Sequence, residues 1–329
     1  MSSDQEALVD PALAPPPQGE KDNNERPRLN YKNYGNIIMF ILNVLFTYGV
    51  GTAGWLDTPG NGELSEKYQT IITPKSSAFA IWAVIFIFQG IFSVLQLMPS
   101  FRGRPMVQEG VSFWYMLVCF WQIGWTFAFA YEVIPLSLVF MLLLWCSLMG
   151  LIISQYYVQL TPYTSSCSSK GLMEFWFLRF PFQVHGGWIT AATALNISVV
   201  AVDSGSAAAT QLAVGIVSLA VLHAISVWHL FGYRRPNYTI PIVLIWANGW
   251  IYGELQEPKQ LVLFTFDQSV IRGVAYAAFT VAMVITIQVV FRVAFLIYNV
   301  VIGESYLQEK IEQGVEQGVE QGVEQEDEE

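Results

Sequence analysis

The sequence predicts an all-α integral membrane protein with about eight transmembrane helices. Hydrophobic residues make up 53% of the 329-residue chain and charged residues only 13%, whereas about a quarter of the residues of a soluble domain are charged. The charges also lie in short clusters between long apolar runs that suit bilayer spans of about 20 residues. The predicted spans are 37–55, 78–98, 113–131, 134–157, 180–202, 210–231, 238–253 and 273–299.

The lengths of the apolar runs and the polar segments between them indicate separate membrane-spanning helices. The first six are long and almost free of charge, and arginine-containing or other polar loops separate them. The run 238–253 is short and has polar flanks, but it is needed to keep the C-terminal Lys310 on the side of the other basic clusters. The run 273–299 is longer than a bilayer requires, so we expect its C-terminal part to project beyond the membrane.

The two ends of the chain differ in composition from the spans. Residues 1–36 are polar, acidic and rich in proline, which predicts a disordered tail and does not resemble a secretory signal. Residues 304–329 contain Glu-Gln-Gly-Val repeats and end in acidic residues, which predicts a low-complexity, solvated tail. The net charge of −10 comes largely from these tails. No basic field remains that would bind nucleic acid.

The distribution of basic residues predicts the orientation. With eight spans, one side holds both termini, and eleven basic residues lie there: Lys21, Arg26, Arg28, Lys32, Arg102, Arg104, Lys170, Arg179, Arg234, Arg235 and Lys310. The other side holds four: Lys67, Lys75, Lys259 and Arg272. Basic loops stay in the cytosol, so both termini are expected there. The sequence does not indicate which cellular membrane holds the protein.

Several polar and aromatic side chains interrupt the apolar runs. Trp121 and Trp125 are four residues apart and share a helical face, with Gln122 beside them. In the predicted span 180–202, His185 precedes Trp188 by three residues, so these two side chains share a face of that helix. Aromatic walls with occasional hydrogen-bonding groups suit a large planar or apolar ligand. Helix packing and interhelical hydrogen bonds are the alternative explanation for each of these residues, as they are for Gln89, Asn196 and Asn248.

No catalytic pattern is present. The sequence lacks a nucleophile motif, a phosphate-binding loop and a constellation of carboxylates. His223 and His229 are six residues apart, which matches neither a zinc site nor a haem-ligand pair. We therefore expect a protein that is not an enzyme, with no catalytic residue and no metal site.

Three segments resemble the tryptophan-rich sensory protein/translocator protein family. Thr73-Pro74 followed by Phe79-Ala-Ile-Trp82 resembles the Pro-rich entry to the second helix of that family. The segment that begins Trp121-Gln122-Ile-Gly-Trp125 resembles its third helix, with Gln122 where Asn is usual. The most specific match runs from Trp188 to Asn196 and resembles the fifth-helix signature W-x-x-x-A-T-x-L-N.

The resemblance implies a five-helix bundle over 37–202. The apolar runs add three helices over 203–303, which short members of the family lack. The resemblance also implies a pocket for a hydrophobic planar ligand such as a haem-like porphyrin or a sterol, with no cofactor required. Carried across by position, the lining candidates are Trp82, Trp121, Gln122, Trp125, Trp188, Ala192 and Asn196. His185 joins them because it shares a face with Trp188. The expected partners are the bilayer and this small molecule, with homo-oligomerisation left open.

The predicted function is to bind, sense or translocate that ligand. One alternative is an ion-coupled secondary transporter of a polar solute, although the spans hold few acidic residues and no inverted repeat is evident. The other alternative is a structural or assembly subunit of a larger membrane complex. The departures from the family pattern, namely a single proline before Phe79 and the three extra spans, leave the identity of the ligand open.

Overall fold

The computed structural model describes residues 28–160 and 169–326, and within them every regular element is a helix. The predicted N-terminal tail, residues 1–36, thus lies mostly outside the described residues. The short elements are η2 (Trp55–Asp57), α2 (Asn61–Lys67), η3 (Ser76–Ala80), η4 (Met106–Val111), α6 (Ser169–Glu174), η6 (Phe175–Arg179) and α10 (Gln260–Thr265). The long helices are α1 (Tyr31–Gly49), α3 (Ile81–Leu95), α4 (Trp114–Ala130), α5 (Ile134–Leu160), α7 (Phe180–Asp203), α8 (Ala208–Phe231), α9 (Thr239–Gln256) and α11 (Gln268–Glu326).

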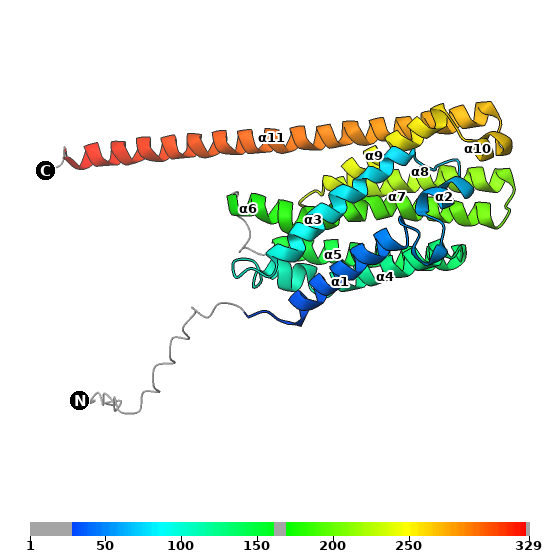
Figure 1. Ribbon diagram of the computed structural model, residues 1–329. Helices are drawn as coiled ribbons and strands as arrows, with labels where there is room; N and C mark the ends of the chain where they lie inside the picture. The colour runs from blue at the N-terminus through cyan, green and yellow to red at the C-terminus, as the bar shows by residue number, and fades with distance from the viewer. Residues whose placement is uncertain (1–27, 161–168, 327–329) are drawn as a thin grey trace, which may run out of the picture.

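Successive long helices run in opposite directions within one bundle (Figure 1). Each of them corresponds to one predicted apolar run. Helix α1 begins at Tyr31, six residues before the expected start of the first span, and α11 continues as one helix to Glu326. Six of the described helical stretches are long and apolar enough to cross a membrane, and these include α3, α4, α5, α7, α8 and α11.

Helices α1 and α9 are the long helices that are more polar than those six. The polar side chains of α1 form hydrogen bonds inside the bundle: Asn33 Nδ2 donates to the Gln96 carbonyl at 3.1 Å, and Asn36 Nδ2 to Gln96 Oε1 at 3.3 Å. In α9, Asn248 is fully buried, and Glu254 accepts a hydrogen bond of 2.9 Å from Gln69. These polar groups face protein rather than lipid, so they do not expose unpartnered groups to hydrocarbon.

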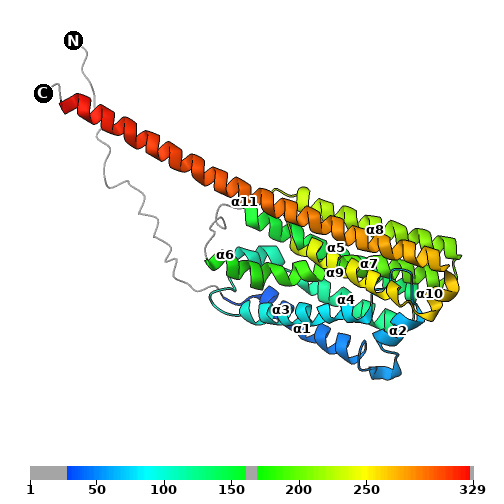
Figure 2. The same ribbon diagram turned by 90° about the horizontal axis from the view of Figure 1, so that it is seen from above.

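Helix α7 lies at the centre of the bundle (Figure 2). Among the candidate spans it is the most enclosed, because 72% of the residues in its most apolar 18-residue segment are buried. Helices α3 and α5 pack against it, and so do α8 and α9 from the part of the chain after residue 202. A single apolar cluster joins Ile152 of α5 and Ala194 of α7 to residues of α8, α9 and α11. The expected boundary at residue 202 therefore falls between two helices that pack directly on each other.

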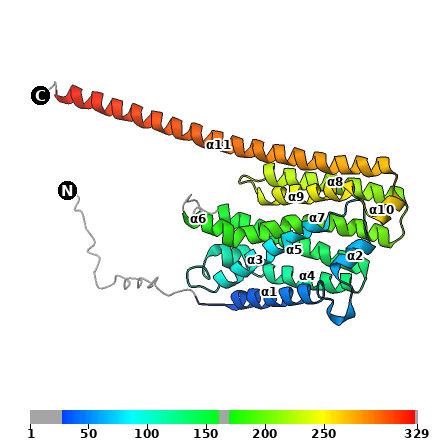
Figure 3. The same cartoon turned by 45° about the horizontal axis from the view of Figure 1, so that its top comes forward.

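Figure 3 shows α6 at one end of the bundle and α2 and α10 at the other, and these two ends differ in charge and in the segments that cover them. The end that carries α6, here the basic end, includes Lys32, Arg102, Arg104, Arg179, Arg234 and Arg235. The opposite end, here the pocket end, is covered by residues 50–80, here the cap, which contains η2, α2 and η3. Gly54 has φ +65°, and Leu56 and Asp57 also lie in the left-handed region, so the chain reverses sharply there.

Apolar contacts and backbone hydrogen bonds fix the cap on the bundle. Leu64 of α2 is 1% exposed and packs with Phe129, Ile134 and Val199. From α9, Trp246 Nε1 donates to the Ala78 carbonyl at 3.1 Å. The Trp250 carbonyl of α9 accepts from the backbone N–H of Lys75 at 3.1 Å. A helix from the C-terminal part of the chain thus holds the segment that leads into α3.

Candidate functional site

A narrow chamber lies below the cap, between α3, α4, α5 and α7. Its volume is about 80 Å³. Its walls are mainly aromatic and aliphatic, and no charged side chain is among the lining residues. They are Asn61, Ser65, Tyr68, Thr73, Phe79, Trp82, Gln122, Trp125, Phe129, Met141, Leu144, Trp188, Ile189, Ala192, Leu195, Asn196 and Val199.

Aromatic rings in edge-to-face and stacked pairs form the walls of the chamber. Trp188 meets Phe79 at a ring-centroid distance of 5.5 Å and Trp82 at 6.4 Å, both nearly perpendicular. On the α4 side, Trp125 stacks on Phe129 at 5.1 Å. Such pairs restrict ring rotation, and each adds about 0.5–1.5 kcal/mol beyond the burial of its area. The chamber therefore has rigid aromatic surfaces.

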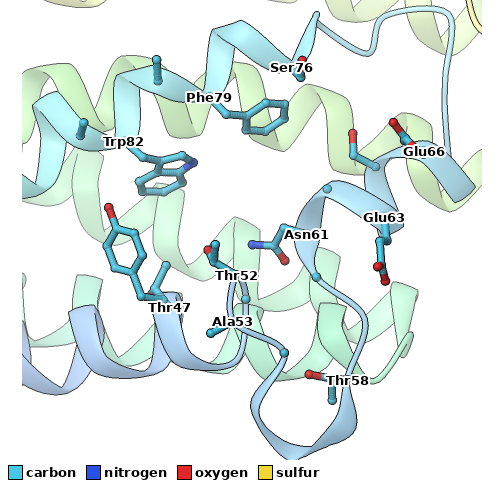
Figure 4. A pocket seen from close by; sticks show the side chains of 18 of the residues that line it. Thr47, Thr52, Ala53, Thr58, Asn61, Glu63, Glu66, Ser76, Phe79 and Trp82 are labelled. Carbon is cyan, nitrogen blue, oxygen red and sulfur yellow. The ribbon is translucent and has the colours of Figure 1, made fainter.

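A larger vestibule of about 880 Å³ adjoins the chamber at the pocket end. Figure 4 shows Phe79, Trp82 and Asn61 directed into this space, and Thr52 and Thr47 beside it. The vestibule and the chamber share five lining residues: Asn61, Ser65, Phe79, Trp82 and Trp125. Glu63, Glu66 and Lys259 belong to the vestibule alone. The two spaces thus form a polar entrance that leads to an apolar interior.

Unpartnered polar atoms lie in the chamber wall. Gln122 is 1% exposed, and neither its amide nitrogen nor its amide oxygen has a hydrogen-bond partner in the described part of the chain. Trp125 Nε1 and Asn61 Oδ1 also lack a hydrogen-bond partner among the described residues. A buried polar group without a partner costs about 1–3 kcal/mol. A ligand with both donor and acceptor groups would remove this cost.

The structure brings together six of the eight residues expected from the sequence. Trp82, Gln122, Trp125, Trp188, Ala192 and Asn196 all line the chamber. Trp121 does not, because its ring packs between Phe120 at 4.8 Å and Phe140 at 6.0 Å, measured between ring centroids.

His185 is likewise not a lining residue. It lies behind Trp82, with 5.6 Å between ring centroids. Its Nδ1 accepts a hydrogen bond of 2.9 Å from Gln89 Nε2. Tyr115 in turn donates to Gln89 Oε1 at 3.2 Å. This fully buried chain of hydrogen bonds lies behind Trp82, so the structure places His185 behind the chamber wall rather than in it.

Asn196 both lines the chamber and binds a neighbouring helix. Its Nδ2 donates to Ser137 Oγ of α5 at 3.2 Å. Ser137 Oγ also donates to the Ile134 carbonyl at 2.7 Å. The Asn196 amide is therefore held by α5, whereas the Gln122 amide is not held by any described residue.

Sequence reasoning missed the contribution of the cap. Asn61, Ser65 and Tyr68 line the chamber from above, and Phe79 completes its wall. Phe79 belongs to the segment Phe79-Ala-Ile-Trp82, so the motif itself could have suggested it. The other three lie in a polar, non-periodic segment, and no pattern there predicts where it folds.

An ion pair outside the membrane-spanning segments holds the cap near the chamber. Glu132, in the turn between α4 and α5, accepts hydrogen bonds from Lys67 Nζ and, at 2.6 Å, from the Tyr68 hydroxyl. The Lys67 ammonium, followed by the Tyr68 hydroxyl, lowers the pKa of Glu132 below its ordinary value of 4.5. The same contact raises the pKa of Lys67. Glu132 has φ +58°, a conformation that non-glycine residues rarely adopt.

These features define an all-helical integral membrane protein with an aromatic intramembrane cavity below a cap. A protein-family model described as TSPO-like protein matches residues 33–291, from α1 into α11. The chain therefore belongs to the TSPO-like protein family, and this family indicates ligand binding or sensing in a membrane in general terms. No curated protein matches the chain, and no solved structure matches it.

Proposed function

We propose that this protein binds a hydrophobic, planar small molecule, of the class of a tetrapyrrole or a sterol, between the vestibule and the chamber. The observation that carries this proposal is the buried Gln122 amide without a described partner among the faces of Trp82, Trp125 and Trp188. The vestibule volume of about 880 Å³ falls within the range of about 300–1,000 Å³ for small-molecule sites. The ligand places its flat face against the tryptophans and a polar group at Gln122.

The ligand enters through the vestibule. With both termini in the cytosol, as the basic end suggests, the vestibule opens on the opposite side of the membrane. The role is non-enzymatic, and the bound ligand is sensed or moved. An ion-coupled transporter is less favoured, because the chamber is lined by no charged side chain among the described residues that could carry the coupling ion.

The first test replaces the amide of Gln122 with a group of similar size. Gln122→Leu removes two unpartnered polar atoms, so we expect unchanged or higher thermal stability. We also expect about ten-fold weaker binding of protoporphyrin, measured by quenching of tryptophan fluorescence in detergent. Gln89→Leu is the control for stability, because Gln89 is equally buried but hydrogen-bonded to His185 and Tyr115, so we expect this variant to be destabilised. Unchanged protoporphyrin binding by Gln122→Leu would contradict the proposal.

The second test compares two tryptophans. Trp188 is 2% exposed in the chamber wall, whereas Trp228 on α8 is 61% exposed. We expect Trp188→Ala to abolish saturable binding of protoporphyrin and of a fluorescent sterol, and Trp228→Ala to leave the binding unchanged. Equal affinity in the two variants for both probes would rule out the chamber as the site.

A further inference from the structure

A second, smaller pocket lies at the basic end, on the far side of the bundle from the vestibule. It forms where the end of α5, the start of α7 and the loop between α8 and α9 meet, near α6 in Figure 1. Two arginines line it: Arg179 of η6 and Arg235 of the loop. Its void of about 20 Å³ is sufficient for one water-sized group, such as an oxygen of a larger anion.

Arg179 is the first group that points to a ligand. Its Nε is buried and has no hydrogen-bond partner among the described residues. The guanidinium lies over the ring of Phe175, with 5.8 Å from its central carbon to the ring centroid. Glu174 of α6 acts on Arg179 electrostatically but forms no ion pair with it within the described chain. A buried donor of a cationic group is costly when it has no acceptor. An anionic or strongly accepting partner would satisfy the Nε of Arg179.

Asn237 is the second such group, and its orientation is fixed. Its Oδ1 caps α9 by accepting from the backbone N–H groups of Thr239 at 3.0 Å and Ile240 at 3.3 Å. The opposite end of the amide, Nδ2, is consequently a donor in the pocket wall. Asn237 is 8% exposed, and its Nδ2 has no partner among the described residues.

The remaining polar groups also present donors. Gln183 Oε1 accepts from Thr239 Oγ1 at 2.9 Å, which leaves its amide N–H groups to donate. The Tyr156 hydroxyl accepts from the backbone N–H of Arg234 at 3.1 Å and retains its own hydrogen. Arg235 is anchored by a bond of 2.9 Å from Nη1 to the Gln159 carbonyl. Gln155 Oε1 is the one pocket-lining acceptor that lacks a described partner.

We propose that this pocket binds a phosphate-type oxyanion, supplied by the headgroup of an anionic membrane lipid. An oxyanion accepts several hydrogen bonds at once and compensates both arginines, and charge-assisted bonds of this kind are about twice as strong as neutral ones. Two tyrosines, a residue type enriched at membrane interfaces, line the pocket: the rings of Tyr156 and Tyr233 lie 4.8 Å apart between centroids and are tilted by 59°. Basic pockets between helices at the membrane interface bind the phosphates of lipid headgroups. The same chemistry would admit free phosphate, which the experiment separates.

The test uses the full chain in neutral detergent. Native mass spectrometry counts bound phosphatidylglycerol against phosphatidylcholine, and thermal unfolding is measured with and without inorganic phosphate. The informative variant is Asn237→Asp, which keeps the cap of α9 but replaces the donor with a negative charge. Arg179→Gln is the second variant. Arg104→Gln is the matched control, because Arg104 is a partly exposed arginine at the same end that does not line the pocket, and its Nε donates to the Ser100 carbonyl.

We expect Asn237→Asp and Arg179→Gln each to lower phosphatidylglycerol occupancy about ten-fold, and Arg104→Gln to leave it within about two-fold. Stabilisation of the native protein by inorganic phosphate, absent in Asn237→Asp and without any lipid preference, would support the oxyanion site with free phosphate as its source. Equal binding of the two lipids together with no phosphate effect would overturn the proposal. Full phosphatidylglycerol binding by a folded Asn237→Asp variant would overturn it too.

Discussion

The Gln122 amide and the Arg179 Nε are both buried polar groups without hydrogen-bond partners in the described chain, but their surroundings differ. Gln122 lies among tryptophans, in a chamber with no charged lining residue. Arg179 lies beside Arg235 and the donor nitrogen of Asn237. The first site suits a neutral or weakly polar planar molecule, and the second suits an anion. Burial of an unpartnered group indicates a site, whereas the neighbouring groups determine the class of ligand.

The largest expected effect on stability comes from placing a lysine at each of the two sites. Gln122→Lys places an ammonium in a chamber without an acidic partner, so we expect a loss of about 4 kcal/mol in the free energy of unfolding, or failure to fold. Arg179→Lys keeps the charge of the basic pocket and should cost less than about 1 kcal/mol. Chemical denaturation in detergent micelles measures both. Equal costs would show that the two surroundings do not differ electrostatically.

A smaller effect separates the bound amide of Asn196 from the unpartnered amide of Gln122. We expect Asn196→Leu to cost about 1 kcal/mol, because it removes the hydrogen bond to Ser137. A double-mutant cycle with Ser137→Ala should give a coupling of about 0.6 kcal/mol, the usual value inside membranes. The corresponding cycle between Gln122→Leu and Ser137→Ala should give none, and a comparable value there would contradict the distinction.

The smallest effect concerns the cap and depends on pH. Because the folded protein lowers the pKa of Glu132, the contribution of this carboxylate is present above its ordinary value of 4.5 and is lost as the pH falls through the lowered value. The pKa of Lys67 is raised, so its contribution is complete below its ordinary value of 10.5 and is lost above the raised one.

We therefore expect amide protection factors in residues 61–68, which compare the exchange rate with that of an unstructured peptide at the same pH, to be high between these limits and lower at acidic pH. Glu132→Gln should show low protection factors throughout and no acidic transition. An acidic transition that persists in Glu132→Gln would assign the effect to another group.

The helices were predictable because lipid imposes a simple rule on sequence. Long apolar runs specified each long helix, although the start of α1 was placed too late. Its first turns carry Asn33 and Asn36, and their polarity concealed a helix whose amides bind Gln96 inside the bundle. Hydropathy does not distinguish a polar face directed at protein from a loop.

The site was predictable where it lies on helices and not where it depends on the cap. Trp188, Ala192 and Asn196 are spaced along one helix, so one motif identified three lining residues. Trp121 was expected in the chamber from the family resemblance and shares a predicted helical face with Trp125, but its ring packs near Phe140 of α5. Helical spacing gives a common face and does not say which neighbour the face meets. The cap residue Asn61 is positioned by tertiary contacts that no local pattern encodes.

The bonds between the cap and α9 have a mechanical consequence. Trp246 and Trp250 hold the segment that begins α3, and α9 also packs along α11, which continues well past the basic end. A movement that separates the cap from α9 must break these bonds, whereas a tilt of α11 that carries α9 along preserves them. Any movement of the long C-terminal helix that carries α9 along would therefore also move the cap, whose residues line the vestibule.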